Sequence, residues 1–173
     1  RTLIGREQID AAKTPVLFIE LKSGQNGTLT PYPGQGIGEI WLGADGATVT
    51  LDGGILKATR GMGDDMMGSY SFIPPWSKIN SISEYYGRNI GYIKGNNKIS
   101  KRKLKCIIKK YKQQELHEIW GLQFRVTKFE ETCEENGFKI KNIYYVDNQE
   151  IVRKSLQYHS ETIGYISTER LDR

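Results

Sequence analysis

Two adjacent carboxylates, Asp64 and Asp65, come closest to a catalytic pair in this chain. Paired Asp or Glu side chains act as acid and base, or as acid and nucleophile, in the hydrolysis of glycosidic bonds. The pair belongs to the stretch LKATRGMGDDMMGSY, residues 56–70. Neighbours in sequence rarely point at opposite sides of one sugar ring, so a polysaccharide-modifying enzyme that uses Asp64 and Asp65 is an alternative and not the leading hypothesis.

The same stretch predicts a structural corner. Gly61 and Gly63 allow positive φ where a strand ends. One of the aspartates would cap a short helical turn that carries Met66 and Met67 into the core, and Arg60 would pair with either carboxylate. The predicted structural corner consists of Arg60, Gly61, Gly63, Asp64 and Asp65.

Other catalytic or cofactor-binding patterns fail on inspection. His117 and His159 have no third metal ligand at useful spacing and no HExxH arrangement, and the chain has no GxSxG sequence. The segment at 34–38 resembles a phosphate loop but leads into a strand, and residues 61–65 would face a phosphate with two carboxylates. We therefore expect no catalytic set, no cofactor and no metal.

The chain contains two cysteines, Cys106 and Cys133. They are too few for a cysteine-based zinc site and lack CxxC spacing. Free buried thiols would suit the cytosol, whereas a disulfide would suit the periplasm or the exterior. The residues alone leave both open.

Positive charge is concentrated in one strip of the sequence. Residues 94–112 hold nine of the 25 Lys and Arg residues and no acid, which leaves 16 basic and 20 acidic residues elsewhere. Such a strip can attract a polyanion, although lysines also keep a solvated strand edge from aggregating. No nucleic-acid-binding motif accompanies it, so we expect no nucleic acid. The expected contacts to an acidic glycan are Lys101, Lys103, Lys105 and Lys109, with Trp76 as an exposed aromatic side chain.

The elements that position these residues are mostly strands. A helix is expected within 2–13, a strand at 15–21, a loop at 22–38 and a three-stranded meander at 39–61, with turns at Asp45-Gly46 and Asp52-Gly53. Residues 71–87 read as a loop with a helical turn, and further strands follow to the end. We predict one mainly β domain over residues 1–173, an antiparallel meander sheet curled as a half-barrel or sandwich with short helices.

Two blocks, 39–67 and 129–171, resemble the YjbF/GfcB family of bacterial outer-membrane lipoproteins, which are encoded with group 4 capsule and exopolysaccharide genes. The matching features begin with the strand led by Trp41 and the Asp45-Gly46 turn. They continue with Thr59-Arg60-Gly61, Gly63-Asp64-Asp65-Met66, the late Cys133 before a Tyr-Tyr-Val strand, and a final Ile-Gly-Tyr-Ile strand.

The resemblance implies a lipoprotein whose lipid-bearing cysteine lies upstream of Arg1 and which faces the periplasm from the outer membrane. It implies a β-rich half-barrel and a part in polysaccharide assembly or export beside other proteins of that machinery. It supplies no catalytic residues, so we expect a protein that is not an enzyme; a lipid-binding periplasmic carrier is a further alternative. An oxidising periplasm favours a Cys106–Cys133 disulfide.

Overall fold

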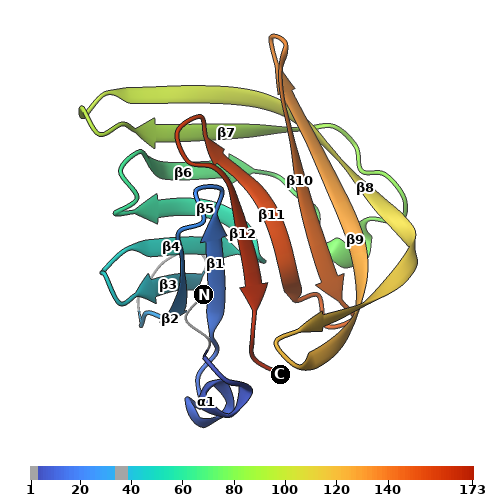
Figure 1. Cartoon of the computed structure of the whole chain (residues 1–173). Coiled ribbons are helices and arrows are strands. Elements are labelled where there is room, and N and C mark those ends of the chain that lie inside the picture. The colour runs from blue at the N-terminus through green and yellow to red at the C-terminus, as the bar shows by residue number, and fades with distance from the viewer. Residues whose placement is uncertain (1–3, 34–38) are drawn as a thin grey trace.

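The computed structural model describes residues 4–33 and 39–173, which form one antiparallel sheet of 12 strands. The sheet curls until its two outermost strands, β5 (Ile55–Arg60) and β6 (Asp65–Ser71), lie next to each other (Figure 1). The mainly β antiparallel fold predicted from the sequence is confirmed, and the sheet is nearly closed into a barrel-like shape.

The strands follow the order β5-β4-β3-β2-β1-β12-β11-β10-β9-β8-β7-β6 across the sheet, so almost every neighbour in space is a neighbour in sequence. The exception is the pairing of β1 with β12, which joins the two ends of the chain. The remaining elements are α1 (Arg6–Ala11), β1 (Leu17–Leu21), β2 (Asn26–Pro31), β3 (Glu39–Gly43), β4 (Thr48–Asp52), the 3-10 helix η1 (Trp76–Lys78), β7 (Tyr86–Ile93), β8 (Ile99–Ile119), β9 (Leu122–Glu135), β10 (Phe138–Asp147), β11 (Val152–Ser160) and β12 (Gly164–Arg170).

Three expectations about local structure are wrong. The predicted loop at 22–38 contains β2, and its last five residues, 34–38, lie outside the described part of the chain. Met66 and Met67 lie in β6 and not in a helical turn, so one is buried and the other exposed. The strands are also not all short, because β8 has 21 residues and bends at a register shift between Lys110 and Gln114.

The interior of the barrel is packed with apolar side chains from both halves of the sheet. Trp41, Val49 and Met66 meet Ile140 and Ile166 in the largest buried cluster. Side chains fill the interior in small barrels of this kind. The short helix α1 packs Ile9 against β1, β9 and the C-terminal Leu171 at one end of the molecule (Figure 1).

Cys106 and Cys133 form a disulfide between β8 and β9. The two residues are directly opposite each other in the ladder and fully buried. The β8–β9 hairpin turns at Trp120-Gly121, with φ values of 48° and 82°, and β9 continues into β10 through a second tight turn at Asn136-Gly137, with φ values of 46° and 83°. The disulfide therefore links the longest hairpin of the sheet near the end of its ladder that is far from the turn.

Removing the disulfide tests its share of the stability. A Cys106→Ala, Cys133→Ala variant should lose about 3–4 kcal/mol of unfolding free energy, because the bond closes a 27-residue separation in the unfolded chain. Guanidinium denaturation of the oxidised wild type, the reduced wild type and the variant measures this. A variant that unfolds at the midpoint of the oxidised wild type would contradict the expectation.

Candidate functional site

The seam between β5 and β6 is where the candidate catalytic residues gather. Among the described residues these two strands form no backbone ladder. Side chains join them instead: Thr59 Oγ1 accepts a hydrogen bond from Met66 N at 3.0 Å, and the Arg60 guanidinium donates to the carbonyl oxygens of Met66 at 3.0 Å and Met67 at 3.4 Å. Thr59 and Arg60 thus replace the missing ladder at this seam.

Farther along the same edge, Gln157 forms hydrogen bonds with backbone groups at β5 that have no partner strand. From β11 its side chain reaches into the interior, accepts a hydrogen bond from Leu56 N and donates one to Gly54 O, both at 2.8 Å. It donates a second one to Ser155 Oγ at 2.9 Å. One buried amide therefore serves the unpaired peptide groups of a strand edge.

Asp65 holds the chain at the corner between β5 and β6. Its carboxylate accepts hydrogen bonds from Gly61 N at 2.8 Å, Met62 N at 3.0 Å and Thr59 Oγ1 at 3.1 Å. Gly61 and Gly63 have φ of 84° and 95°, the positive values expected of them. The expected pairing of Arg60 with an aspartate is wrong, because the carbonyl groups of the seam engage its guanidinium.

Asp64 points away from Asp65 and ties other turns to the corner. It accepts hydrogen bonds from Gly95 N at 2.9 Å and from the Thr162 hydroxyl. The hydrogen bond from Thr162, followed by that from Gly95, lowers the pKa of the Asp64 carboxyl. The two carboxylates thus have separate partners, and neither arrangement resembles an acid and base on two sides of a substrate.

His159 lies directly behind the corner and is fully buried. Its Nε2 is 2.8 Å from Thr59 Oγ1, and its Nδ1 is 2.9 Å from Ser160 Oγ. Since the Thr59 hydroxyl donates to Asp65, Nε2–H must donate to Thr59, and Nδ1 accepts from Ser160. Burial lowers the pKa of the His159 ring to about 4, against the opposing effect of Asp65 and Asp64. The ring is neutral at pH 7 and bound on both sides.

A second polar centre inside the barrel surrounds Glu131, whose exposure is 0%. Its carboxylate accepts hydrogen bonds from Arg88 at 2.6 Å, Asn142 at 2.7 Å, Tyr144 at 3.1 Å and the Tyr86 hydroxyl. Burial raises the pKa of both tyrosines, followed by the charge of Glu131. A buried carboxylate bound by four donors is held in place, and its acceptor sites are occupied by groups of the fold itself.

Sequence analysis missed this centre, although a signal existed. In β9, Phe129, Glu131 and Cys133 occupy alternate positions, so period-2 spacing places the glutamate on the inward face. Glu131 also lies near the sulfurs of Cys106 and Cys133. Those sulfurs are joined in the disulfide, which removes the thiolates that a metal would need.

Trp76 is not the exposed aromatic residue that the sequence predicts. It begins η1 and is only 7% exposed. Its ring packs 4.9 Å from Phe129 and 5.1 Å from Tyr144 between ring centroids, and its Nε1 donates to Gly53 O at 3.2 Å. Trp76 therefore closes one end of the core and has no free ring face for a glycan.

The four predicted lysines lie together on the outer face of β8. Lys101, Lys103, Lys105 and Lys109 are exposed and alternate with inward residues such as Leu104. No described residue forms an ion pair with any of these four. By contrast, three outward lysines of other strands form ion pairs: Lys141 binds Glu130 at 3.0 Å, Lys128 approaches it at 3.8 Å, and Lys154 binds Glu169 at 3.4 Å.

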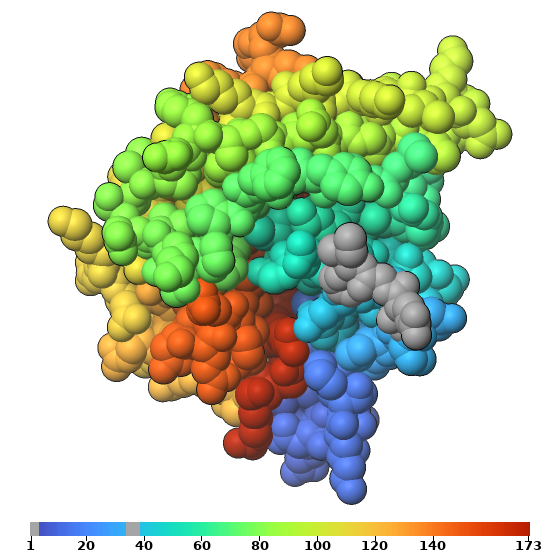
Figure 2. All heavy atoms as spheres, turned by 180° about the vertical axis from the view of Figure 1, so that it is seen from behind, coloured from blue at the N-terminus to red at the C-terminus, as the bar shows by residue number. Residues whose placement is uncertain are grey.

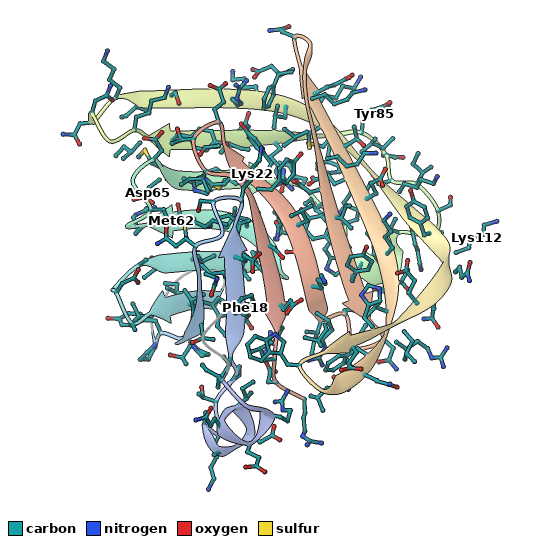
Figure 3. All side chains as sticks on the ribbon, in the orientation of Figure 1. Phe18, Lys22, Met62, Asp65, Tyr85 and Lys112 are labelled. Carbon is teal, nitrogen blue, oxygen red and sulfur yellow. A yellow bond between two sulfur atoms is a disulfide. The ribbon has the colours of Figure 1, made fainter. Side chains whose placement is uncertain are left out.

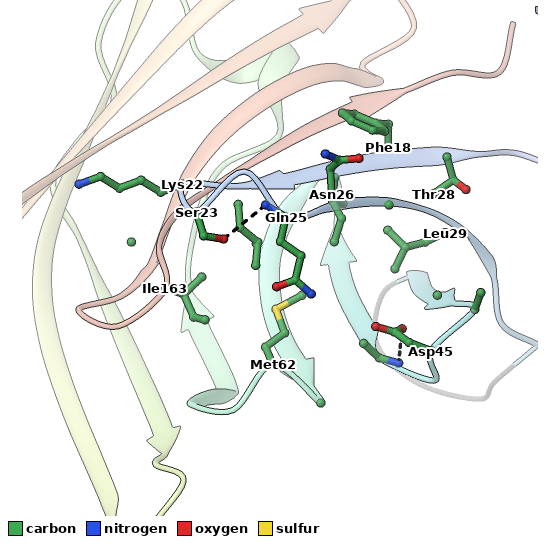
Figure 4. Close-up of a pocket in the computed structure, with 18 of the residues that line it drawn as sticks. Phe18, Lys22, Ser23, Gln25, Asn26, Thr28, Leu29, Asp45, Met62 and Ile163 are labelled. Atoms are coloured by element: carbon green, nitrogen blue, oxygen red, sulfur yellow. Dashed lines mark hydrogen bonds between the residues drawn. The ribbon is translucent and has the colours of Figure 1, made fainter. Parts of the chain in front are cut away.

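A cavity of about 970 Å³ opens at the end of the barrel where four connections meet. These are the β1–β2, β3–β4 and β11–β12 turns and the β5–β6 corner. Figure 4 shows Gln25 from the first of them lying beside Met62 and Ile163. In Figure 3, Met62 and Asp65 lie together at the edge of the molecule beside these turns. The walls are mainly apolar and amide groups.

Comparisons with known proteins place the whole chain in one group. A family model described as group 4 capsule polysaccharide lipoprotein gfcB, YjbF matches residues 1–171. The crystal structure of the hypothetical lipoprotein YmcC from Escherichia coli K12 superimposes with a TM-score of 0.79 at 18% identity, over 99% of this chain and 90% of that one. No curated protein matches. Within residues 4–33 and 39–173, no helix is both long and apolar enough to cross a membrane.

Replacing Asp65 tests whether the corner is structural. Asp65→Ala removes the acceptor of two backbone N–H groups and one hydroxyl, and we expect a loss of about 1–3 kcal/mol of unfolding free energy. Asp52→Ala is the matched control, since Asp52 only approaches Lys57 at 3.9 Å in solvent. Equal unfolding midpoints for the two variants would refute a structural role for Asp65.

Acid should destabilise the protein through His159. The folded pKa of about 4 lies below the unfolded value of 6.5, so the unfolded chain binds the proton first as pH falls. Stability is full above pH 6.5 and is lost toward pH 4, with a decrease of about 2 kcal/mol between pH 7.5 and pH 5. Chemical denaturation at both pH values measures it. His159→Gln should reduce this slope, and an unchanged slope would assign it to other groups.

Proposed function

The chain belongs to the YjbF family of group 4 capsule polysaccharide lipoproteins, and on that premise we propose that it is a non-enzymatic binding protein of capsule or exopolysaccharide assembly and export. It acts facing the periplasm, held at the outer membrane by a lipid anchor outside these residues. Its partners are an anionic polysaccharide and other proteins of the export machinery. The lysines of β8 contact the polymer.

The observation that carries this proposal is the row of lysines on the outer face of β8. Lys101, Lys103, Lys105 and Lys109 share that face, and their ammonium groups form no ion pair with a described acidic side chain, although Glu134 and Glu130 of β9 stand opposite Lys105 and Lys109 in the ladder. Neighbouring charges of one sign raise the local concentration of a polyanion and speed its association. An anionic polymer would supply the counter-charges that the fold supplies to Lys141 and Lys154.

Protection of a strand edge explains these lysines less well. Lysine is useful on an edge strand because that strand exposes unpaired peptide groups. Lys105, however, is paired on both sides, with Gly87 of β7 and Glu134 of β9, whereas Lys101 and Lys103 have a partner only in β7. Edge protection therefore accounts for part of the row only, and the outermost strands of the sheet are β5 and β6.

The enzyme alternative has less support because its residues are already engaged. Asp65 accepts three hydrogen bonds at the corner, and Asp64 accepts two from other turns. The lipid-carrier alternative has less support because Trp41, Met66 and Ile166 pack inside the barrel. A lipid chain inside the barrel would need to displace that core.

Charge removal on β8 tests the proposal. Lys103, Lys105 and Lys109 changed together to Ser should weaken binding of purified capsule polysaccharide from the host by roughly tenfold or more at low salt, because three cations are lost from one face. Binding by the wild type should also weaken as salt is raised. Isothermal titration calorimetry across a salt series measures both effects.

A matched control separates position from net charge. Lys128, Lys141 and Lys154 changed together to Ser remove the same charge from outward lysines that are already ion-paired. This variant should retain most of the affinity. No binding by the wild type at low salt would refute direct handling of the polymer, and equal losses in the two variants would refute a role for the β8 row.

A further inference from the structure

We propose that the outer face of β6, β7 and β8 binds an acidic polysaccharide in two adjoining rows, with sugar rings stacked on Tyr70, Phe72 and Tyr85 and the acidic groups paired with the lysines of β8. This inference rests on the proposed function and names the part of the surface that binds the sugar rings. A polymer of charged sugars presents both chemistries at once, because each ring has apolar C–H faces and the acidic substituents project from its rim.

Strand register places the two rows side by side. Tyr70 of β6 is opposite Asn89 of β7, which is opposite Lys103 of β8. Two residues away, at the next position on this face, Gly87 of β7 is opposite Lys105. Two strand spacings separate the outer strands, about 10 Å in all. The aromatic row and the lysine row therefore run parallel at a distance that one sugar chain and its substituents can bridge.

The strand between the two rows, β7, carries no bulky side chain on this face. On this face β7 presents Gly87, Asn89 and Gly91. A Cβ built on Gly87 would meet no atom within 4 Å, so the space above it is open. No large side chain of β7 separates Tyr70 and Phe72 from the lysines in this region. The surface of β7 between the two rows is therefore accessible to a ligand along both of them.

The aromatic residues are unusually exposed for a folded chain. Phe72 is 93% exposed, Tyr70 74% and Tyr85 61%. The Tyr70 ring also lies close to Gly68, where an added Cβ would be 3.3 Å from the ring, so the glycine leaves room for the ring beside the strand. Clustered exposed aromatic side chains mark interaction sites more often than single ones do, and a flat, free ring face suits stacking on a sugar.

The two rows meet at Tyr85. The Lys105 ammonium lies 4.4 Å from the centroid of its ring, a cation–π contact that holds both groups at the end of the rows. Phe72, Ile82 and Tyr85 line a surface depression of about 590 Å³ here, in which Glu84 is the acidic residue and Lys78 a further cation. That volume is within the roughly 300–1,000 Å³ typical of small-ligand sites. In Figure 2 the green segment around residues 70–86 covers much of this side of the molecule, next to the yellow-green start of β8.

Charge complementarity selects the acidic polymer as the occupant. A neutral glycan would use the rings and leave the lysines without partners, and a polyanion that lacks rings would use only the lysines. Because no ion pair within the described residues neutralises Lys101, Lys103 or Lys105, the face as a whole favours an anionic ligand with planar apolar surfaces.

The experiment separates the two rows. Tyr70→Ser, Phe72→Ser should weaken binding of the purified capsule polysaccharide by roughly tenfold, while binding of inorganic polyphosphate, which has charge but no rings, changes less than about twofold. Tyr32→Ser, Leu116→Ser is the matched control, since both residues are exposed (51% and 61%) and lie away from the two rows: Tyr32 follows β2, and Leu116 is on β8 beyond its ladder with β7. It should bind both polymers as the wild type does. Circular dichroism and melting temperatures verify that all variants fold.

Each other outcome is decisive. If the serine variant at 70 and 72 binds the polysaccharide normally while the Lys103, Lys105, Lys109 variant does not, the stacking row is refuted and the proposed function stands. If the wild type binds neither polymer, both fail. If the variant keeps the polysaccharide but loses binding to phosphatidylglycerol vesicles, the aromatic row serves a membrane surface and this inference is overturned.

Discussion

Closure of the barrel by side chains is the constraint on which the rest of the structure depends. A curled sheet with two free edges must satisfy the peptide groups of both, since buried unpaired N–H and C=O groups are costly. Here β5 and β6 meet without a ladder, and Gln157, Thr59 and Arg60 bind the edge groups that a neighbouring strand would otherwise bind. This requirement explains why Gln157, Thr59 and His159 are polar at buried positions beside the seam, whereas the cluster around Glu131 is a separate polar centre.

The same constraint explains why the most reactive-looking residues are structural. Thr59 can bind Met66 N only if its hydroxyl hydrogen has another acceptor, which Asp65 provides, and His159 completes the hydrogen bonds of Thr59 from the interior. A carboxylate, a hydroxyl and an imidazole in a row suggest a catalytic relay. In this fold Asp65, Thr59 and His159 are all engaged in the hydrogen bonds of the seam, and the imidazole is fully buried.

Structural features that neighbouring residues determine could be predicted from the sequence, and features that depend on distant residues could not. The meander at 39–61 depends on alternation and on tight turns, which neighbouring residues determine; the first turn includes the predicted Asp45-Gly46, and the second lies at Gly53-Gly54, one residue beyond the predicted Asp52-Gly53. β2 was missed because glycine and proline dominate its surroundings. The burial of Trp76 depends on Phe129 and Tyr144, more than 50 positions away, and the pairing of Tyr70 with the lysine row depends on the register of three strands.

The distribution of charge on the outer face distinguishes structural lysines from those available to a ligand. Along β9 and β10, cross-strand neighbours of opposite sign neutralise one another, as Glu130 does for Lys141. Toward β7, glycine and asparagine stand opposite the β8 lysines, so that side offers no counter-charge. A strand that needed only solubility would be served equally well by paired charges. The asymmetry between the two flanks of β8, with exposed aromatic rings only on the uncompensated side, is what directs a binding hypothesis to this face.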